Sequence, residues 1–338
     1  IAAVTEGLRS FLAFSPDAIV ALGGGSPIDT AKAVRKLALE QGHDLPAGLV
    51  VIPTTSGSGS EVTAFAVVTD AESHAKLPLT SVDMLPEVAI LDAEAVLTAP
   101  PRLTADSGMD AVSHAIEAYV AKGANVFSDA LAEKALRLAD AALVRCFVDG
   151  SDAQAREQQH AAATMAGIAF QNAGLGIVHG LSHAIGGSFK VAHGRLNGIL
   201  LPHVIAFNAG PIGLRPHELS DVARRYAALA RAMGLQASNE RNLVLALSGW
   251  VERLRRDLAM PATVTAQNAA EAAQGAVGQP AGEGLDDVGF RSPAGLADGL
   301  VGAGEPWQAV VEGVDEAPVG GSELAAGHGR ADGVAGAA

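Results

Sequence analysis

All strand signals of this 338-residue sequence lie in its first hundred residues. Short runs rich in β-branched residues alternate there with a helical stretch, which is typical of parallel strands joined by crossovers. From Pro101 onward, long helical stretches replace them. The sequence therefore predicts an α/β domain over 1–100 and an all-α domain over 101–261. The expected strands are 18–24, 49–53, 61–70 and 87–92, and the expected helices are 26–40, 103–122, 127–146, 153–174, 216–233 and 240–257.

The last part of the chain, 262–338, has a different composition. It is rich in Gly, Ala and acidic residues and shows no sustained hydrophobic period, so we expect a low-complexity tail without a packed core. The chain as a whole carries a net charge of −14, and much of this charge comes from the tail. The charge is therefore a poor guide to the function of the folded part.

Composition also argues against two classes of partner. No basic stripe is present and aromatic residues make up 4% of the chain, so binding to nucleic acid is not expected. Gly, Pro or charged residues interrupt every apolar stretch before the roughly 18 residues of a membrane span, so no membrane partner is expected either. Cys146 is the single cysteine, which excludes an internal disulfide and fits a cytoplasmic protein.

A glycine-rich turn follows the first predicted strand, in AIVALGGGSPIDTAKAV. Gly23, Gly24 and Gly25 let a ligand approach the backbone, and the N–H groups of a helix expected to open at Ser26 suit a phosphate. The turn does not match the G-x-G-x-x-G fingerprint or a P-loop. It predicts a pyrophosphate cradle, and a plain strand-to-helix turn is the alternative.

A second polar loop, PTTSGSGSEVT at 53–63, follows the next predicted strand. Its hydroxyl side chains and two glycines predict a flexible, donor-rich loop at the carboxyl edge of the sheet, where α/β proteins bind ligands. Two such loops after neighbouring strands favour a nucleotide. A surface loop without a ligand is the alternative.

One carboxylate and one imidazole share a face of a predicted helix in SGMDAVSHAIEAY. Asp110 and His114 are four residues apart, and Glu117 lies a further turn along the same stripe. This pattern suits half of a metal site or an ordinary helix pair, so it leaves both interpretations open.

Three histidines in GIVHGLSHAIGGSFKVAHG supply a second set of ligand-type side chains. His179 and His183 are again four residues apart, and His193 follows ten residues later beside Gly194, where the chain can turn back. Buried histidines of an apolar core usually need only a hydrogen-bond partner. Two such stripes in one region of low charge nevertheless favour a shared divalent metal, because an ion satisfies several buried polar groups at once.

Taken together, these motifs resemble the iron-containing (group III) alcohol dehydrogenases, and most closely their propanol and ethanol dehydrogenase branch. The resemblance covers about residues 1–261. It is carried, in order and spacing, by GGGSPIDTAK, PTTSGSGSEVT, KLPLTSVDMLPEVAILD, GMDAVSHAIEAY and GIVHGLSHAIGGSFKVAHGRLNGILLPHVIAFN.

The resemblance implies a dehydroquinate synthase-like architecture, with a nucleotide-binding α/β domain before an all-α metal-binding domain. The implied activity is the interconversion of small primary alcohols and aldehydes with NAD(P). A bound divalent ion, Fe²⁺ or alternatively Zn²⁺, would lower the pKa of the alcohol, and a homodimer is one expected assembly.

The resemblance also implies roles for individual residues. The implied metal ligands are Asp110, His114, His179 and His193, and His183 would stay free to relay the alcohol proton. The positions that match the family's dinucleotide site are Gly24, Gly25, Ser26, Asp29, Thr54, Thr55, Ser58, Thr63, Val67, Lys76 and Leu91.

Several alternatives accompany this interpretation. A glycerol dehydrogenase or dehydroquinate synthase type of enzyme would share the fold, and a metal-dependent hydrolase could use the loops for a phosphate ester. The family's first βαβ segment has no counterpart in this sequence, and residues 262–338 resemble the product of a shifted reading frame. A remnant without activity is therefore a further alternative.

Overall fold

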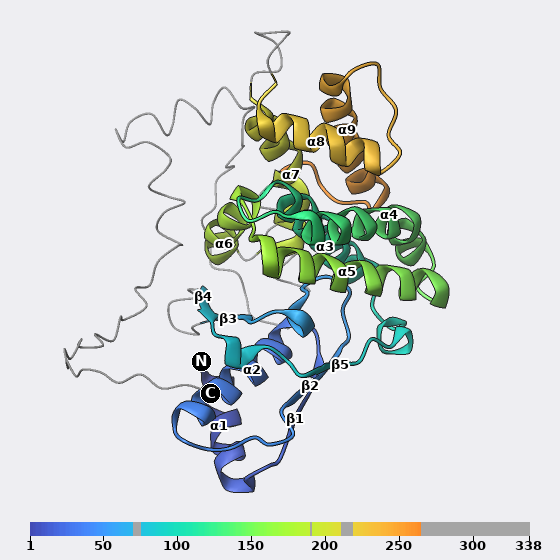
Figure 1. Cartoon of the computed structure of the whole chain (residues 1–338). Coiled ribbons are helices and arrows are strands. Elements are labelled where there is room, and N and C mark those ends of the chain that lie inside the picture. Colours follow the sequence, from blue (N-terminus) through green and yellow to red (C-terminus); the bar gives the residue numbers. More distant parts are fainter. Residues whose placement is uncertain (70–75, 190, 211–218, 265–338) are drawn as a thin grey trace, which may run out of the picture. The chain divides into compact units, whose positions relative to one another are not determined.

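A computed structural model describes residues 1–69, 76–189, 191–210 and 219–264 (Figure 1). All of them belong to the first of two compact units, Ile1–Phe290. The expected tail lies outside the described residues from 265 onward, as does the segment 211–218. The helices and strands are α1 (Ala2–Phe14), β1 (Ile19–Gly23), α2 (Gly25–Glu40), β2 (Leu49–Pro53), β3 (Phe65–Thr69), β4 (Lys76–Thr80), β5 (Val88–Ala89), α3 (Pro101–Val120), α4 (Val126–Val148), α5 (Ala153–Ala173), α6 (Ile177–Phe189), α7 (His193–Ala209), α8 (Asp221–Ala232) and α9 (Glu240–Asp257).

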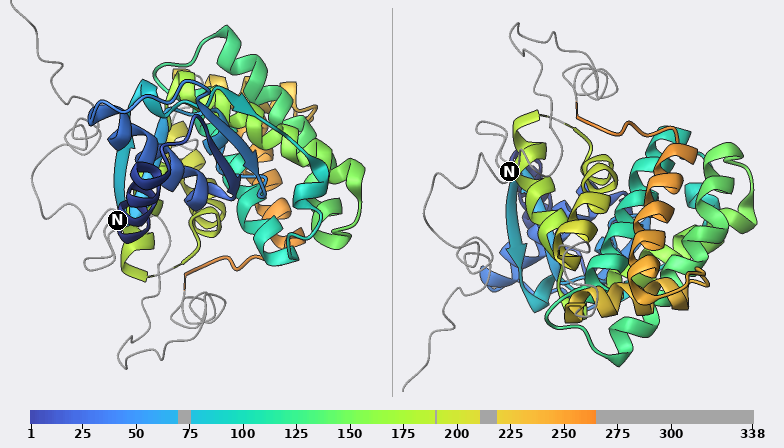
Figure 2. Two further views of the ribbon diagram at one scale, coloured as in Figure 1. Left: turned by 90° about the horizontal axis from the view of Figure 1, so that it is seen from below. Right: turned by 90° about the horizontal axis from the view of Figure 1, so that it is seen from above.

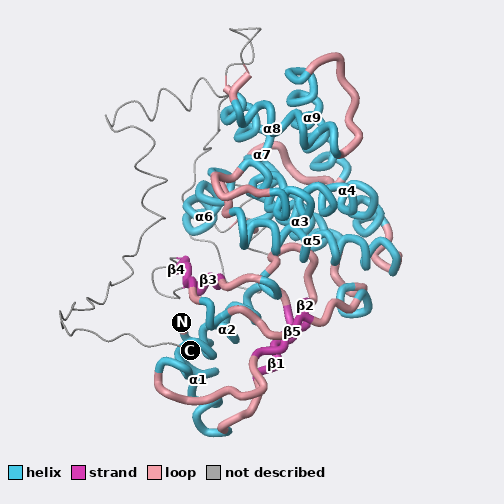
Figure 3. Tube along the Cα trace, in the orientation of Figure 1, coloured by secondary structure: helices cyan, strands magenta, loops and turns pink. Residues whose placement is uncertain are grey.

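The sheet of the α/β part is parallel, as the sequence predicts. Its strands run in the order β1-β2-β5, and Figure 3 shows them together, apart from β3 and β4. One face is covered by α2 (Figure 2). Ile28 of this helix packs against Leu49 and Val51 of the strand β2. The other face exposes Val20 and Leu22, which are 63% and 62% accessible. The alternation of side chains along each strand produces this division into a covered and an open face.

The sequence predicts that all strands of the α/β part run parallel, and this is wrong for the predicted strand 61–70. Its first residues form a 3₁₀ turn, Ser60–Val62, and only Phe65–Thr69 is extended. This strand, β3, pairs antiparallel with β4, which was not predicted and lies apart from the main sheet. The pattern of β-branched residues indicates an extended chain, but it does not specify the partner strand.

Two further differences concern α1 and α2. The helix α1 was not predicted, and it packs Val4 and Phe11 against the outer side of α2. The helix α2 begins at Gly25 rather than Ser26, with Gly24 as its N-cap. The glycine turn therefore extends directly into the first helical turn, with three glycines in succession before Ser26.

The predicted helices of the second part are confirmed to within a few residues where the chain is described. Side-chain caps begin several of them, for example Asn125 before α4 and Asn239 before α9. The helix α3 contacts α4, α5 and α7, and its whole middle section is buried (Figures 1 and 2). Across the described helices, none is by itself long and apolar enough to span a membrane, and only the bent pair of α5 with Ile177–Gly186 meets these two criteria jointly.

Candidate metal centre

Two members of the predicted metal set come from the buried middle of α3. Asp110 and His114 are four residues apart, so both side chains leave the same face of the helix, where they are 9% and 4% accessible. The ring of His114 stacks between Phe170 and the ring of His179, at centroid distances of 4.4 and 4.5 Å. This packing fixes the plane of the imidazole and directs its Nε2 toward Asp110.

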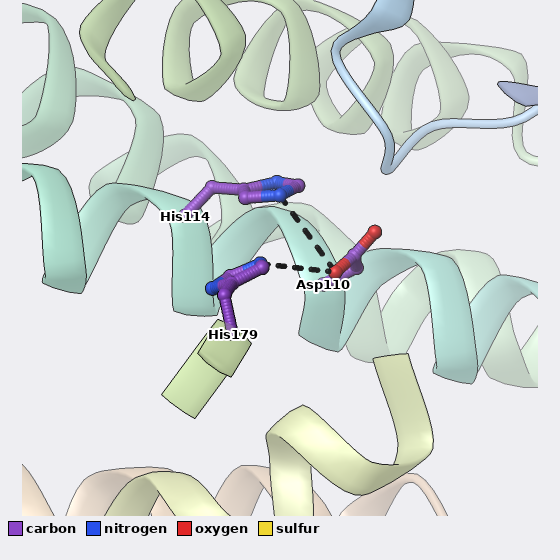
Figure 4. Close-up of side chains that lie close together, drawn as sticks. All are labelled: Asp110, His114 and His179. Atoms are coloured by element: carbon purple, nitrogen blue, oxygen red, sulfur yellow. Dashed lines mark ion pairs between the residues drawn. The ribbon is translucent and has the colours of Figure 1, made fainter. Parts of the chain in front are cut away.

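The other two members come from α6 and α7. His179 lies in the first turn of α6, and His193 is the first residue of α7 rather than part of the turn before it. Figure 4 shows His114 and His179 directed toward the carboxylate of Asp110. The structure therefore brings together the four side chains that the sequence predicts as metal ligands.

The distances within this cluster suit a divalent ion. The Nε2 atoms of His114, His179 and His193 lie 3.8, 3.6 and 3.7 Å from the same oxygen, Oδ1 of Asp110. In a tetrahedral site with bonds of about 2.0–2.2 Å, neighbouring ligand atoms are about 3.4 Å apart. The ligand atoms of Asp110, His114 and His179 lie within 4.8 Å of one another, and His193 joins this group through its distance to Asp110. One carboxylate and three imidazoles also form a donor set that Fe²⁺ and Zn²⁺ accept.

Two contacts of α7 hold His193 in place. The Arg195 guanidinium donates to both oxygens of Asp106, one turn before Asp110 on α3, at 2.9 and 3.3 Å. Gly194 permits close approach, because a Cβ at this position would lie 1.9 Å from the carbonyl oxygen of Asp106. The start of α7 is therefore locked against α3 beside the cluster.

The protonation states differ among the four side chains. Burial raises the pKa of Asp110, but the neighbouring histidines lower it by more, so the carboxylate stays ionised. Burial lowers the pKa of His114 to about 4 and that of His193 to about 3. Burial also acts to lower the pKa of His179, but the carboxylates of Asp110 and Glu117 raise it to about 9. Near neutral pH, His114 and His193 thus keep free lone pairs, whereas His179 holds a proton in the absence of metal.

His183 lies beside the cluster, with its ring 4.7 Å from that of His193, and no ion pair joins it to Asp110 among the described residues. Burial, followed by the charges of Lys76 and His179, lowers its pKa to about 4. His183 is therefore a weaker base than an ordinary histidine, whose pKa is 6.5. The Lys76 amine approaches α6, within 3.6 Å of a Cβ placed at Gly186.

The predicted cradle and the hydroxyl loop face each other. A Cβ at Gly24 would lie 3.1 Å from Thr55, and one at Gly25 would lie 3.2 Å from Ser58. The first turn of α2 and the loop after β2 thus border one small region at the carboxyl edge of the sheet. In this region Thr54, Thr55 and Ser58 remain half-buried rather than enclosed.

Other polar groups of the predicted cofactor site point inward. Asp29 accepts hydrogen bonds from the Ser60 hydroxyl at 2.6 Å and from the Val67 N–H at 2.9 Å. Thr63 is buried, and its carbonyl and hydroxyl accept from Lys32 at 2.7 and 3.2 Å. These side chains therefore hold the loop to α2, whereas Leu91, 43% accessible, lies on the surface.

The loop is packed against the helical part rather than free. A Cβ at Gly57 would lie 2.4 Å from the carbonyl oxygen of Ser107 on α3, and Gly59, with φ of +65°, lies against Gly167 on α5. The Ser56 hydroxyl and Nδ1 of His160 are 2.9 Å apart. These contacts contradict the expectation of a flexible loop, because glycine here permits close packing instead of motion.

The sequence interpretation did not assign two residues of the centre. Asn197 donates to Oδ1 of Asp110 at 2.7 Å and lies 3.2 Å from Nε2 of His179. Glu117 accepts from Nδ1 of His179 at 2.6 Å. Helical spacing already placed Glu117 on the stripe of Asp110 and His114, though without a role, and it could also have identified Asn197, which follows His193 by four residues.

A cluster of one aspartate and three histidines is a donor set for a catalytic divalent ion, and the same chain carries a glycine-rich strand-to-helix turn suited to a nucleotide. The sequence matches the family descriptions "Iron-containing alcohol dehydrogenase" over residues 1–93 and "Fe-containing alcohol dehydrogenase family, C-terminal" over residues 104–293. The chain belongs to the iron-containing alcohol dehydrogenase family. The second match extends past residue 261, where the sequence motifs ended.

Relatives and solved structures agree with this assignment. The 1-propanol dehydrogenase PduQ of Salmonella typhimurium is 39% identical over 265 residues, which cover 78% of this chain and 69% of the relative. The NAD-dependent methanol dehydrogenase of Bacillus methanolicus is 39% identical over 76% of this chain and 68% of its own. A crystal structure of a 1,3-propanediol oxidoreductase matches with a TM-score of 0.69 and 35% identity, covering 76% of this chain and 68% of the other.

Proposed function

We propose that this chain is a metal-dependent, NAD(P)-linked dehydrogenase that interconverts small primary alcohols and aldehydes. The observation that carries the proposal is the convergence of three histidine Nε2 atoms on one oxygen of Asp110, at 3.6–3.8 Å. The relatives that are named propanol, butanol and methanol dehydrogenases support small alcohols as the substrate class.

In this proposal Asp110, His114, His179 and His193 hold a divalent ion, Fe²⁺ or alternatively Zn²⁺. Bound there, the ion would polarise the oxygen of an alcohol or aldehyde and lower the pKa of the alcohol. The lowered pKa values of His114 and His193 support the assignment, because their lone pairs are free for a ligand near neutral pH. The contact between Asp106 and Arg195 would hold His193, at the start of α7, in a fixed position relative to the ligands on α3.

His183 would receive the proton of the alcohol on a ring nitrogen. It stands next to His193 and keeps its ring partly accessible, so it can reach both the reacting centre and water. Its low pKa makes it neutral, and therefore able to accept a proton, at physiological pH.

The dinucleotide would bind across Gly24, Gly25 and Ser26 at the start of α2, with Thr54, Thr55 and Ser58 opposite. Once bound, its nicotinamide would accept hydride from the alcohol carbon. Backbone N–H groups at the first turn of α2 suit the pyrophosphate. We assign an indirect role to Asp29, Thr63 and Val67, which bond within the protein, and a role near the reacting end of the cofactor to Lys76.

One assay tests this function against its alternatives. Nicotinamide absorbance would be followed with methanol, ethanol, 1-propanol, 1-butanol and glycerol, with NAD or NADP, and with Fe²⁺ or Zn²⁺ added to metal-free protein. We expect metal-dependent reduction of the cofactor with the primary alcohols. A preference for glycerol would favour the glycerol dehydrogenase alternative. No turnover in any combination would overturn the proposal.

Two weaker predictions of the sequence belong to the same proposal. We place the enzyme in the cytoplasm, which the single buried cysteine, Cys146, supports. We also propose a homodimer, for which light scattering of the purified protein is the direct test.

A further inference from the structure

Glu117 is buried on the side of His179 that faces away from the metal ligands. Its side chain is 3% accessible, and it lies on α3 seven residues after Asp110, two turns along the same face. Oε2 of Glu117 lies 2.6 Å from Nδ1 of His179, and Oε1 accepts from the Val178 N–H at 2.7 Å. Both oxygens therefore contact consecutive residues of α6.

We propose that Glu117 is a positioning residue that decides which ring nitrogen of His179 is presented to the metal. An ionised carboxylate can only accept hydrogen bonds, so Nδ1 of His179 must carry the hydrogen in this contact. When a metal takes the place of the second proton of His179, Nε2 is therefore the nitrogen that binds it, and Figure 4 shows a ring nitrogen facing Asp110, 3.6 Å away. The inference rests on the proposed function, because it presumes that His179 is a ligand.

The second contact of Glu117 fixes the helix that carries His179. Val178 belongs to the first turn of α6, where backbone N–H groups lack partners within the helix. By accepting from this N–H, Glu117 ties the start of α6 to α3 at the point where the ligand leaves the backbone. Gly176 allows this approach, since a Cβ there would lie 2.8 Å from Oε1 of Glu117.

Glu117 acts through His179 and does not join the ligand set. Its Oε2 contacts Nδ1 of His179, whereas the nitrogen of this ring that faces Asp110 is Nε2. Carboxylates that hold the second nitrogen of a metal-bound histidine commonly change metal affinity by about 10–100-fold when they are removed.

The substitution Glu117→Gln tests this role while keeping the size of the side chain. If the amide oxygen keeps the Val178 N–H, the amide NH₂ faces Nδ1 of His179 and forces the hydrogen onto Nε2. If the amide turns round, its NH₂ meets the Val178 N–H, donor against donor. Either arrangement weakens the ligand, so we expect Zn²⁺ affinity, measured by calorimetry with chelator competition, to fall about 10–100-fold.

Glu133→Gln is the matched control. Glu133 lies on α4 and accepts from the Tyr119 hydroxyl, which an amide oxygen also does, so Zn²⁺ affinity should stay unchanged. A double-mutant cycle separates positioning from general destabilisation. In a His179→Ala background, Glu117→Gln should produce no further loss of affinity, whereas an additive loss would overturn the inference.

A measurement on the wild-type chain keeps the inference testable even if Glu117→Gln does not fold. In Zn²⁺-loaded protein labelled with ¹⁵N-histidine, the ring signals of His179, assigned by their loss in His179→Ala, should show hydrogen on Nδ1. Hydrogen on Nε2 would overturn the inference. Unchanged Zn²⁺ affinity in a folded Glu117→Gln protein would also overturn it and leave the proposed metal site intact, whereas a wild-type chain that binds no Zn²⁺ would refute the proposed site itself.

Discussion

The histidine cluster and the hydroxyl loop are both rich in polar side chains, but they use them in opposite ways. In the cluster, three helices direct nitrogen atoms at one oxygen of Asp110, and three of the four ligand-type side chains are buried. In the loop 53–63, the buried groups bond to the protein itself, as Thr63 does with Lys32. The cluster gathers potential metal-ligand atoms around one carboxylate oxygen, whereas the buried groups of the loop form hydrogen bonds within the protein.

The histidine cluster and the loop 53–63 therefore differ in what stabilises them. In the cluster, Asn197 already donates to Oδ1 of Asp110, and a bound cation would interact with the histidine nitrogens that face this oxygen. The loop already has its partners in Lys32, His160 and Thr164, so it needs no ligand to stay in place. We therefore expect substitutions in the cluster to affect metal binding, and substitutions under the loop to affect folding.

The largest effect is expected for Asp110→Asn, which keeps the shape of the side chain and removes the only negative charge of the ligand set. Four-ligand zinc sites bind with about 10–16 kcal/mol, or about 3 kcal/mol per ligand, and the anionic ligand contributes more than its share. Metal affinity should fall on the order of a thousandfold, measured by competition with a chelator. Asp140→Asn is the control, because an amide can still accept from Trp250. Retained affinity in Asp110→Asn would mean that the cluster is not the metal site.

The next effect separates His193 from His183, which are neighbours with different assigned roles. His193→Ala should lower metal affinity on the order of a hundredfold, as expected for loss of one neutral ligand. His183→Ala should leave the metal bound and lower kcat on the order of a hundredfold, as expected for loss of a proton acceptor. Metal content and steady-state kinetics of both variants would decide this. The reverse pattern would exchange the two assignments.

The helical spacing explains why so much of the cluster could be predicted. Residues four apart on a helix share a face whatever surrounds them, so Asp110 with His114 could be paired from sequence alone. The meeting of α3, α6 and α7 depends on tertiary packing, such as the contact of Gly194 with Asp106, which no local pattern contains. The resemblance to a known family supplied that step.

The loop shows the limit of the same approach. A hydroxyl-rich sequence reveals donors and acceptors but not their direction. The resemblance implies that Asp29 and Thr63 belong to the cofactor site, and in the structure both form hydrogen bonds within the protein. The antiparallel pairing of β3 with β4 was missed for a related reason, since strand pairing is decided by partners distant in sequence. The direction of a side chain in a loop is set by tertiary packing, whereas in a helix it follows from the regular spacing of residues.

A smaller effect, on folding, is expected for Lys32→Met. The Lys32 ammonium is fully buried and donates to the Thr63 carbonyl, the Thr63 hydroxyl and the Phe65 carbonyl. Methionine fills the space but leaves these acceptors without a donor, so the free energy of unfolding in urea should fall by about 2 kcal/mol. Lys36→Met, on the same helix with an accessible partner, should change it by less than about 0.5 kcal/mol. Equal stability of the two variants would show that Lys32 does not hold the loop.

The smallest effect is the pH dependence that the same lysine creates. Burial lowers the pKa of Lys32 from its ordinary 10.5 to about 8, although the nearby carboxylates of Asp29 and Glu61 act to raise it. Between these two pH values the unfolded chain binds more protons at this side chain than the folded chain does. The contribution of Lys32 to the free energy of unfolding therefore rises with pH in this window, by up to about 1 kcal/mol per pH unit.

Other groups titrate in the same range, so the effect of Lys32 must be isolated. The quantity to measure is the free energy of unfolding in urea of wild type minus that of Lys32→Met, at pH 7.5 and at pH 9. We expect this difference to grow in favour of wild type at pH 9. If the difference in the free energy of unfolding between wild type and Lys32→Met became smaller at pH 9, the folded protein would stabilise the Lys32 ammonium better than water does. The loop would then depend on a buried charge, as the cluster does.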